Sequence, residues 1–205
     1  MAIKFKTITT PTGEALFCHT KATETFDGKD TGKYTLLLKL TEAESQELLD
    51  AIHAEWETAK SAEFADKKCT GDMSDGLRVY KEEPLFKFSC NASYKNKHGE
   101  ETSVTIPIFD TAGKEISAQL GEIGNGSKIK VAAKLVPYHM SAKNYGISLR
   151  LTAIQLIDYV PYGSGTAESF GFDTDGKGYT AVEEDDNPFY DSGKGETAED
   201  DGSDF

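Results

Sequence analysis

Apolar and polar residues alternate along three segments of the chain, within residues 34–40, 86–94 and 129–135. A period of two places alternate side chains on one face of a β-strand, so each segment predicts a strand with one buried face. The residues expected on these buried faces are Tyr34, Leu36, Leu38 and Leu40, then Phe86, Phe88, Cys90, Ala92 and Tyr94, and finally Ile129, Val131, Ala133 and Leu135.

Two further segments have the composition of strands. Residues 103–109, SVTIPIF, predict a strand that Pro107 places at a sheet edge or at a bulge, because proline donates no ladder hydrogen bond. Residues 146–160 predict a long final strand. Its apolar positions change parity between Ala153 and Ile154, which indicates a β-bulge.

One helix is predicted between the first and second of the alternating segments. Thr41 followed by Glu44 forms a capping box, which commonly begins a helix. Leu48, Ile52 and Trp56 then recur at intervals of four, the spacing of one helix face. The small or apolar residues expected beside them are Leu49, Ala59 and Ala62.

These elements predict a mainly β domain over residues 1–160. Five or so short strands are typical of a small barrel or of a sandwich, and the pattern alone does not separate the two. The OB-fold is the five-stranded barrel that often binds oligonucleotides, so we expect an OB-fold-like barrel with one long helix. After Pro161 the composition changes to Gly, Ser, Asp and Glu, which predicts a disordered acidic tail over residues 161–205.

The net charge of -13 is unevenly distributed and does not exclude a nucleic-acid partner. Residues 161–205 hold 13 acidic and 2 basic residues, whereas residues 1–160 hold 22 acidic and 20 basic residues. Residues 41–66, the predicted helix region, contain 8 acidic residues and only one basic residue, Lys60. The remaining part of the predicted domain is therefore basic, with 19 bases against 14 acids.

The strand pattern also predicts where the basic side chains point. If Ile129 and its alternating partners are buried, then Lys128, Lys130, Lys134 and Tyr138 share the opposite face. The strands at 86–94 and 146–160 likewise send Lys87 and Arg150 outward. Cations along a groove, with rings on which bases stack, are what single-strand binding requires. The alternative is that outward lysines only solvate a sheet.

Four motifs in collinear order carry a family resemblance. They are GDM at residues 71–73, FKFSCNASY at residues 86–94, GNGSKIKVAAKLVPY at residues 124–138, and the acidic terminus GSDF. Together they resemble the single-stranded DNA-binding proteins of T7-like bacteriophages. The similarity extends over most of the chain and is strongest from Phe86 to Asp158 and at the terminus.

The resemblance implies a non-enzymatic protein with an OB-fold and no cofactor. It implies roles in phage DNA replication, recombination, repair and strand annealing, in the cytoplasm of the infected bacterial host. It also implies a homodimer, and a tail that binds the phage DNA polymerase and helicase-primase. A terminal ring beside carboxylates suits such partner binding. The candidate partner-binding residues are Asp200, Asp201, Asp204 and Phe205.

By position, Tyr138 matches a base-stacking tyrosine of the family and Lys130 matches a basic DNA contact. Three other family contacts are replaced here, by Thr31, Asn91 and Ala132. Lys4, Lys6, Lys33, Lys134 or Tyr94 are candidates to compensate, although the pattern places Tyr94 on a buried face. The complete set of candidate DNA-binding residues is Lys4, Lys33, Lys87, Lys128, Lys130, Lys134, Tyr138 and Arg150.

Other site chemistries are less well supported by the sequence. Residues 121–128, GEIGNGSK, depart from a P-loop in residue order, and a strand rather than a helix is expected to follow. Residues 173–184, DTDGKGYTAVEE, match an EF-hand loop at several positions but place Lys177 where calcium needs an oxygen ligand. The scattered histidines show no zinc spacing with the cysteines. Two rival functions therefore remain: an acidic interaction protein or DNA mimic, and a calcium-binding module.

The compartment is predicted from three weak signals. The residues MAIKFKTITT lack the apolar run of a secretory signal, and no later stretch reaches the length of a membrane span. Cys18, Cys69 and Cys90 are odd in number and share no CxxC spacing, which suits a reducing cytoplasm. We expect all three thiols to be small buried apolar groups.

Overall fold

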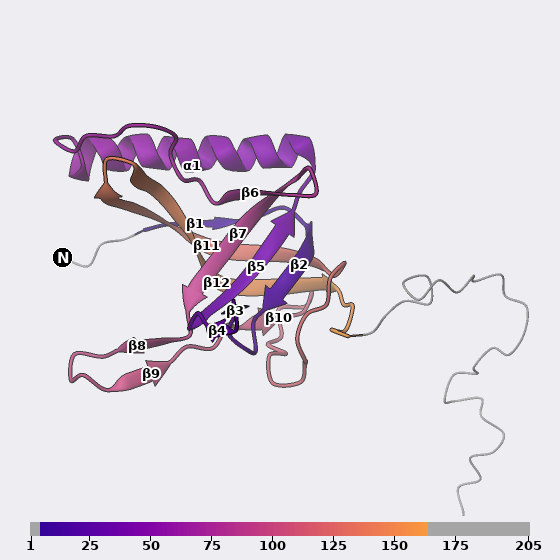
Figure 1. The fold of residues 1–205 in the computed structure, drawn as a ribbon. Helices are drawn as coiled ribbons and strands as arrows, with labels where there is room; N and C mark the ends of the chain where they lie inside the picture. The colour runs from indigo at the N-terminus through magenta and orange to yellow at the C-terminus, as the bar shows by residue number, and fades with distance from the viewer. Residues whose placement is uncertain (1–4, 164–205) are drawn as a thin grey trace, which may run out of the picture. The chain divides into compact units, whose positions relative to one another are not determined.

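The computed structural model describes residues 5–163, which form one helix and a set of mostly antiparallel strands (Figure 1). The elements in chain order are β1 (Lys6–Thr9), β2 (Gly13–His19), β3 (Thr25–Phe26), β4 (Lys29–Asp30), β5 (Lys33–Lys39), α1 (Glu42–Glu63), β6 (Leu77–Tyr80), β7 (Glu83–Asn91), β8 (Ser93–Lys95), β9 (Glu101–Ser103), β10 (Ile108–Phe109), β11 (Lys128–Ser141) and β12 (Asn144–Asp158).

Five strands close into a barrel, because β11 pairs with β2 on one side and with β12 on the other. The order around the barrel is β11, β2, β5, β7, β12 and back to β11. The closing contact between β7 and β12 is parallel and joins Ser89 to Arg150. The expected OB-fold-like barrel is therefore confirmed, and the sandwich is excluded.

The barrel interior contains the apolar residues that the alternating pattern predicts. Leu36 and Leu38 of β5 and Phe86 and Phe88 of β7 are fully buried. The four predicted residues of β11, from Ile129 to Leu135, are also fully buried. Since period-two alternation turns the intervening residues outward, these faces also decide which polar side chains reach the barrel surface.

Helix α1 lies along one end of the barrel and begins with the predicted capping box (Figure 1). The Thr41 hydroxyl accepts a hydrogen bond from the Glu44 N–H, and the Glu44 carboxylate accepts one from the Thr41 N–H. Leu48, Ile52 and Trp56 form the buried stripe of this helix, as expected. Ala62, expected beside this stripe, is exposed. The helix stripe ends before it, because Phe64 stacks on the Trp56 ring instead.

The predicted bulge in the last strand is confirmed close to its expected place. Ala132 pairs with Ala153, and the next residue, Ala133, pairs with Leu151, so one extra residue, Thr152, lies between them. The Thr152 hydroxyl donates a hydrogen bond to the Ala132 carbonyl at 2.7 Å. The bulge lets both parts of β12 bury their apolar residues against the same core.

Two of the expected strands are shorter in the structure than the sequence predicts. Strand β7 ends at Asn91. The Ala92 N–H still donates to the Gly32 carbonyl, in register with β5, at 2.9 Å, but the Ala92 carbonyl accepts a hydrogen bond from the Val104 N–H, so the chain changes partner at this residue. Residues after Ala92 leave the barrel as the β8–β9 hairpin, so Tyr94, expected inside, is 55% exposed. Residues 103–109 do not form one strand. Ser103 is the last residue of β9, and the two-residue β10 begins at Ile108, directly after Pro107.

The predicted tail lies almost wholly outside the described residues. Within residues 5–163, the last contacts are an isolated bridge between Ile123 and Pro161 and a hydrogen bond from the Tyr162 N–H to the Glu122 carbonyl. The boundary at residue 160 and the disorder of the tail stay predictions. No helix in this described part has the length and apolarity of a membrane span.

Candidate nucleic-acid interface

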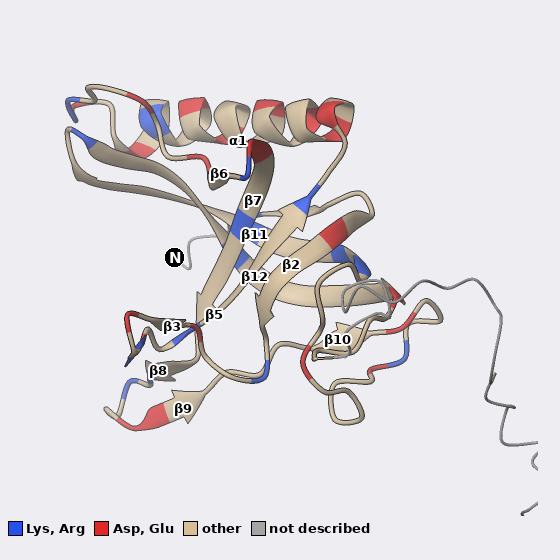
Figure 2. Ribbon diagram, turned by 45° about the vertical axis from the view of Figure 1, so that its right-hand side comes forward, with Lys and Arg blue, Asp and Glu red and all other residues tan. Residues whose placement is uncertain are grey.

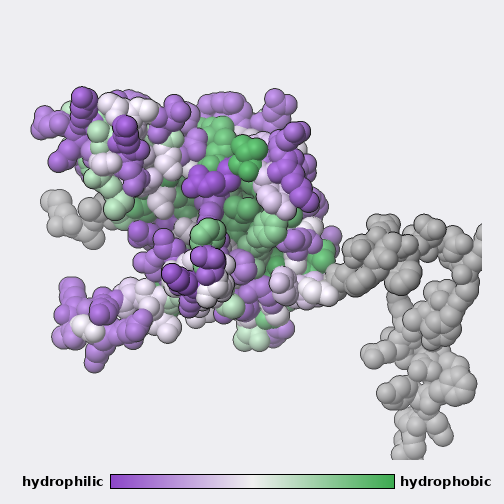
Figure 3. Space-filling model, in the orientation of Figure 1, coloured by the Kyte–Doolittle hydropathy of each residue, from purple (hydrophilic) through white to green (hydrophobic). Residues whose placement is uncertain are grey.

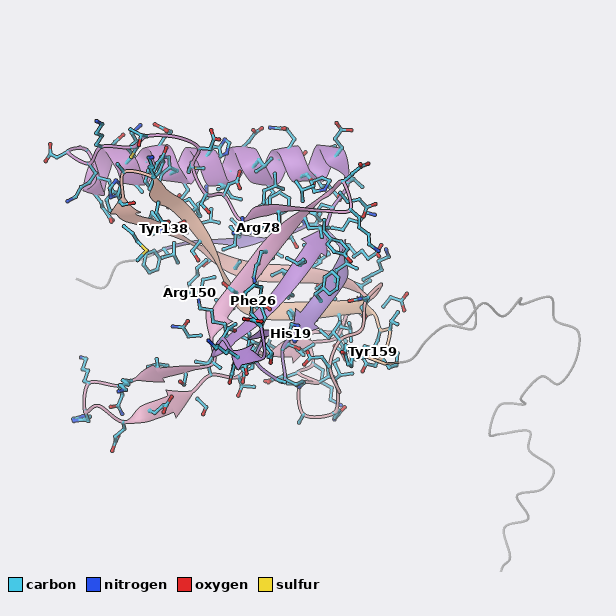
Figure 4. All side chains as sticks on the ribbon, viewed as in Figure 1. His19, Phe26, Arg78, Tyr138, Arg150 and Tyr159 are labelled. Atoms are coloured by element: carbon cyan, nitrogen blue, oxygen red, sulfur yellow. The ribbon has the colours of Figure 1, made fainter. Side chains whose placement is uncertain are left out.

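A hollow of about 650 Å³ runs over the outer surface of the barrel where β5, β7 and β12 meet β6 and the end of β11. We call this hollow the groove. Four cationic side chains line it, and Glu24 is the one acidic residue among its described lining. The cations are Lys33, Arg78, Lys87 and Arg150. Figure 4 labels Arg78, Tyr138 and Arg150, which come from three separate elements of the chain.

The strand register explains why these cations meet. Arg150 of β12 lies opposite Ser89 of β7, which in turn lies opposite Thr35 of β5. Lys33 and Lys87 are two residues from Thr35 and Ser89 along their own strands, so all of them project from the same outer face. The basic groove therefore follows from the same alternation that fills the core.

An aromatic ring completes the groove at the extended β11–β12 hairpin. Tyr138 of β11 lies opposite Gly146 of β12, and both Tyr138 and Met140 line the groove. Gly146 has a φ of 145°, and a Cβ there would lie 2.0 Å from the Ser74 carbonyl oxygen. The glycine thus lets the segment around Ser74, which also lines the groove, pack directly on the hairpin.

The GDM motif, directly before Ser74, also contacts this hairpin. The Tyr145 hydroxyl donates a hydrogen bond to the Gly71 carbonyl at 2.6 Å. Tyr145 is buried, and its ring lies 5.2 Å from that of Trp56 on α1. The motif therefore holds in place the hairpin that carries Tyr138. This contact gives GDM a structural role beside the other motifs that carry the family resemblance.

Lys87 is paired within the groove by the one carboxylate that lines it. The Lys87 ammonium donates hydrogen bonds to both Glu24 carboxylate oxygens, at 2.9 and 3.0 Å. Both side chains are about a third exposed, so the pair is open to exchange with a solvent ion. A phosphate that binds Lys87 competes with Glu24 for the ammonium N–H groups.

Three of the predicted lysines do not line the groove. Lys128 starts β11 and forms an ion pair of 3.3 Å with Glu14, whereas Lys130 lies opposite Gln155. Lys134 does not line the groove, although it lies opposite Arg150 at its edge. Alternation does turn these lysines and Tyr138 outward, because the residues from Ile129 to Leu135 that alternate with them are buried, but only Tyr138 lines the groove. From Lys128 to Tyr138 the strand extends about 33 Å and twists, so its outward face turns around the barrel.

The remaining candidates lie outside the described residues. They are Lys4, Asp200, Asp201, Asp204 and Phe205. The EF-hand-like segment, residues 173–184, also falls there. Among residues 5–163, no group of three or more His, Cys, Asp or Glu side chains is placed to hold a metal ion.

Two groove features were missed from the sequence. Arg78 lies on β6, a strand that no alternating pattern indicated. Phe26 is 76% exposed at the β3–β4 hairpin, whose base lies at Glu24 and Thr31 on the groove wall. The Asp27-Gly28 pair, with φ of 50° and 70°, turns this hairpin. That dipeptide was the signal available in the sequence.

The three cysteines differ in burial, so the expectation that all are buried is only partly correct. Burial raises the pKa of Cys18 to about 12, with a smaller contribution from the Glu122 carboxylate, so this thiol stays protonated at neutral pH. Cys90 is partly buried, which raises its pKa, while nearby Arg150 opposes the rise. Cys69 is also only partly buried. All three are free thiols.

Figure 2 shows basic residues on the central strands and acidic residues along α1. With this geometry in place, the family model described as "Single-stranded DNA-binding protein, Bacteriophage T7" matches residues 19–159. The chain belongs to this family. The match covers the helix, four of the five barrel strands and every groove residue described above, so the resemblance inferred from the four motifs is confirmed.

Two curated relatives of the phage family are each named a single-stranded DNA-binding protein. The one from Enterobacteria phage T3 is 35% identical over 100 residues, which cover 48% of this chain and 43% of the relative. The one from Escherichia phage T7 is 33% identical over 98 residues, covering 47% of this chain and 41% of the relative. The aligned segment thus spans less than half the length of either relative.

Solved structures of phage single-stranded DNA-binding proteins share the fold. Gp2.5 of bacteriophage T7 aligns with a TM-score of 0.66 at 24% identity, over 87% of this chain and 100% of that chain. The protein of bacteriophage Enc34, in complex with single-stranded DNA, aligns with a TM-score of 0.54 at 13% identity, over 77% of this chain and 89% of that one. Because both identities are below 25%, these likenesses show the fold alone.

The resemblance predicts that three family DNA contacts are replaced in this chain, and two of those positions lie in the hollows of this surface. Thr31 lines the groove, and Asn91 lies in a second hollow beside it. Ala132 lines neither hollow. Neutral side chains therefore stand at the first two positions, and Arg78 brings a cation to the same groove from a different strand.

Proposed function

We propose that the protein binds single-stranded DNA in the groove, as a binding protein and not as an enzyme. One observation carries this proposal: the barrel of a single-stranded DNA-binding family brings Lys33, Arg78, Lys87 and Arg150 together beside Tyr138. The cations suit the phosphate backbone, and the ring offers a stacking surface for a base of any sequence. The binding is therefore without sequence preference.

The charge arrangement within the groove supports backbone binding. Among residues 5–163, no ion pair within 4 Å joins a carboxylate to Lys33, Arg78 or Arg150. Lys134 and Arg150 lie opposite each other across the β11–β12 ladder, and like charges in that position repel. A phosphate between them relieves this repulsion, so DNA binding offsets a cost already present in the fold.

The wider role follows from the family and not from the groove. We place the protein in phage DNA replication, recombination, repair and strand annealing, in the cytoplasm of the infected bacterial host. Its acidic tail, with Asp200, Asp201, Asp204 and Phe205, then recruits the phage DNA polymerase and helicase-primase, and two copies form a homodimer. Family membership and the composition of the tail support these proposals.

Binding to labelled oligonucleotides separates this function from its rival, an acidic interaction protein or DNA mimic. We expect fluorescence anisotropy to show tight binding to oligo(dT) and much weaker binding to a duplex of the same length. Four groove cations predict a slope of about -2.8 for the logarithm of the affinity against the logarithm of salt concentration. A protein that binds neither nucleic acid at low salt is the result that the DNA-mimic function predicts.

A further inference from the structure

The β8–β9 hairpin carries an exposed ring that the barrel does not need. Tyr94 lies on β8, is 55% exposed, and belongs to no part of the buried core. Figure 1 shows the hairpin extending from the end of the barrel opposite α1, and Figure 3 shows it as a mostly hydrophilic projection. An exposed tyrosine on such a projection has a large apolar surface without a partner among the described residues.

Hydrogen bonds along its length, at its turn and at its base order the β8–β9 hairpin. Ser93 and Ser103, Tyr94 and Thr102, and Lys95 and Glu101 form its antiparallel pairs. The Asn96 side chain closes its turn by accepting hydrogen bonds from the N–H groups of His98 and Glu100, at 2.9 and 3.0 Å. At its base, the Val104 N–H donates to the Ala92 carbonyl at 2.7 Å. The Tyr94 ring is therefore held at a defined place.

A second hollow, of about 480 Å³, lies between this hairpin and the groove. It shares Lys33, Ser89, Ser148 and Arg150 with the groove, so the two hollows are continuous. Tyr94 forms part of its wall. Its described lining includes two cations, Lys33 and Arg150, and no carboxylate. The second hollow therefore combines cations, small polar groups and an aromatic ring, as the groove does.

We propose that the second hollow is a further nucleotide site, in which Tyr94 stacks on a base and Arg150 contacts the adjoining phosphate. The DNA strand passes from Tyr138 at one end of the groove, over Arg150, to Tyr94 on the hairpin. Asn91 and Ser93 line the hollow without charge and suit the edges of any base. The inference rests on the proposed function, because it extends the same DNA path.

The extension predicts an effect that depends on oligonucleotide length. We expect Tyr94→Ala to bind the shortest strands as tightly as the unaltered protein and to lose about 5- to 150-fold in affinity for strands that span both hollows. Tyr94→Phe retains the ring and should retain the affinity. The measurement is anisotropy with full-length protein and oligo(dT) from about 4 to about 16 nucleotides, the range of site sizes known for OB-folds.

Tyr162→Ala is the matched control, because Tyr162 is 71% exposed and lines neither hollow. It should bind every length normally. Equal affinities for Tyr94→Ala and the unaltered protein at all lengths, with Tyr138→Ala weakened, would overturn the inference and leave the proposed function intact. Loss of dimerisation with normal DNA binding in Tyr94→Ala would also overturn it. If the unaltered protein binds no strand of any length, the proposed function itself fails.

Discussion

Replacing Tyr138 by alanine is expected to weaken single-strand binding roughly 5- to 150-fold and to leave its salt dependence unchanged. The ring lines the groove beside the cations, where a base stacked on it contributes about 1–3 kcal/mol. Stacking releases no counterions, so the slope of affinity against salt concentration stays the same. Anisotropy with oligo(dT) at several salt concentrations measures both quantities.

Tyr138→Phe is the control for this variant, because it keeps the ring and removes only the hydroxyl. It should bind within a few-fold of the unaltered protein. Tyr138 is only half-buried and lies outside the core cluster, so neither substitution should lower the melting temperature greatly. A destabilised Tyr138→Ala protein that binds DNA normally once folded would show that the ring is structural.

Removing Phe205 alone is expected to weaken binding to the phage DNA polymerase about 30-fold and to change single-strand binding by no more than a few-fold. An aromatic anchor in a partner pocket contributes about 2 kcal/mol or more, while the acidic residues beside it steer the approach. The deletion removes no charged side chain and keeps Asp200, Asp201 and Asp204, so the net charge is the same. An account based on charge alone therefore predicts no loss.

Surface plasmon resonance over immobilised polymerase measures this effect. Phe205→Tyr is the matched variant, because it keeps an aromatic ring at the same position. We expect it to bind almost as well as the unaltered chain. Equal affinities for the intact protein and the protein without Phe205 would show that the terminal ring has no part in partner binding.

Strand periodicity predicts the core of this protein well because a single physical rule governs it. Leu36, Phe88 and Ile129 are buried where alternation places them, and the capping box of Thr41 and Glu44 begins the helix as expected. The bulge near Ala153 was also predictable, since a change of apolar parity has one simple structural cause. These features depend on neighbours in the sequence.

The site depends on how distant strands meet, and here periodicity alone was not enough. Alternation placed Lys128 and Lys130 on the same strand face as Tyr138, but the twist of β11 turns them away from the groove. It also placed Tyr94 inside, although after Ala92 the chain pairs within the β8–β9 hairpin and leaves the barrel. The register between β7 and β12 pairs Arg150 with Ser89 and so brings Arg150 into the groove that Lys87 lines, and no local pattern contains that register.

The most direct test of the groove compares two charge-neutralising variants, Glu24→Gln and Glu14→Gln. Each frees one lysine from an ion pair of similar exposure: Lys87 inside the groove in the first, and Lys128 outside it in the second. Removing a carboxylate close to a bound phosphate should strengthen binding by about 1 kcal/mol, or about fivefold, at low salt.

We therefore expect Glu24→Gln to bind oligo(dT) about fivefold more tightly than the unaltered protein, and Glu14→Gln to bind it almost unchanged. A gain in affinity cannot result from misfolding, so the comparison depends only on where DNA lies. If Glu14→Gln gains affinity while Glu24→Gln does not, the DNA strand follows the face of β11 that carries Lys128, and the groove is not the DNA site.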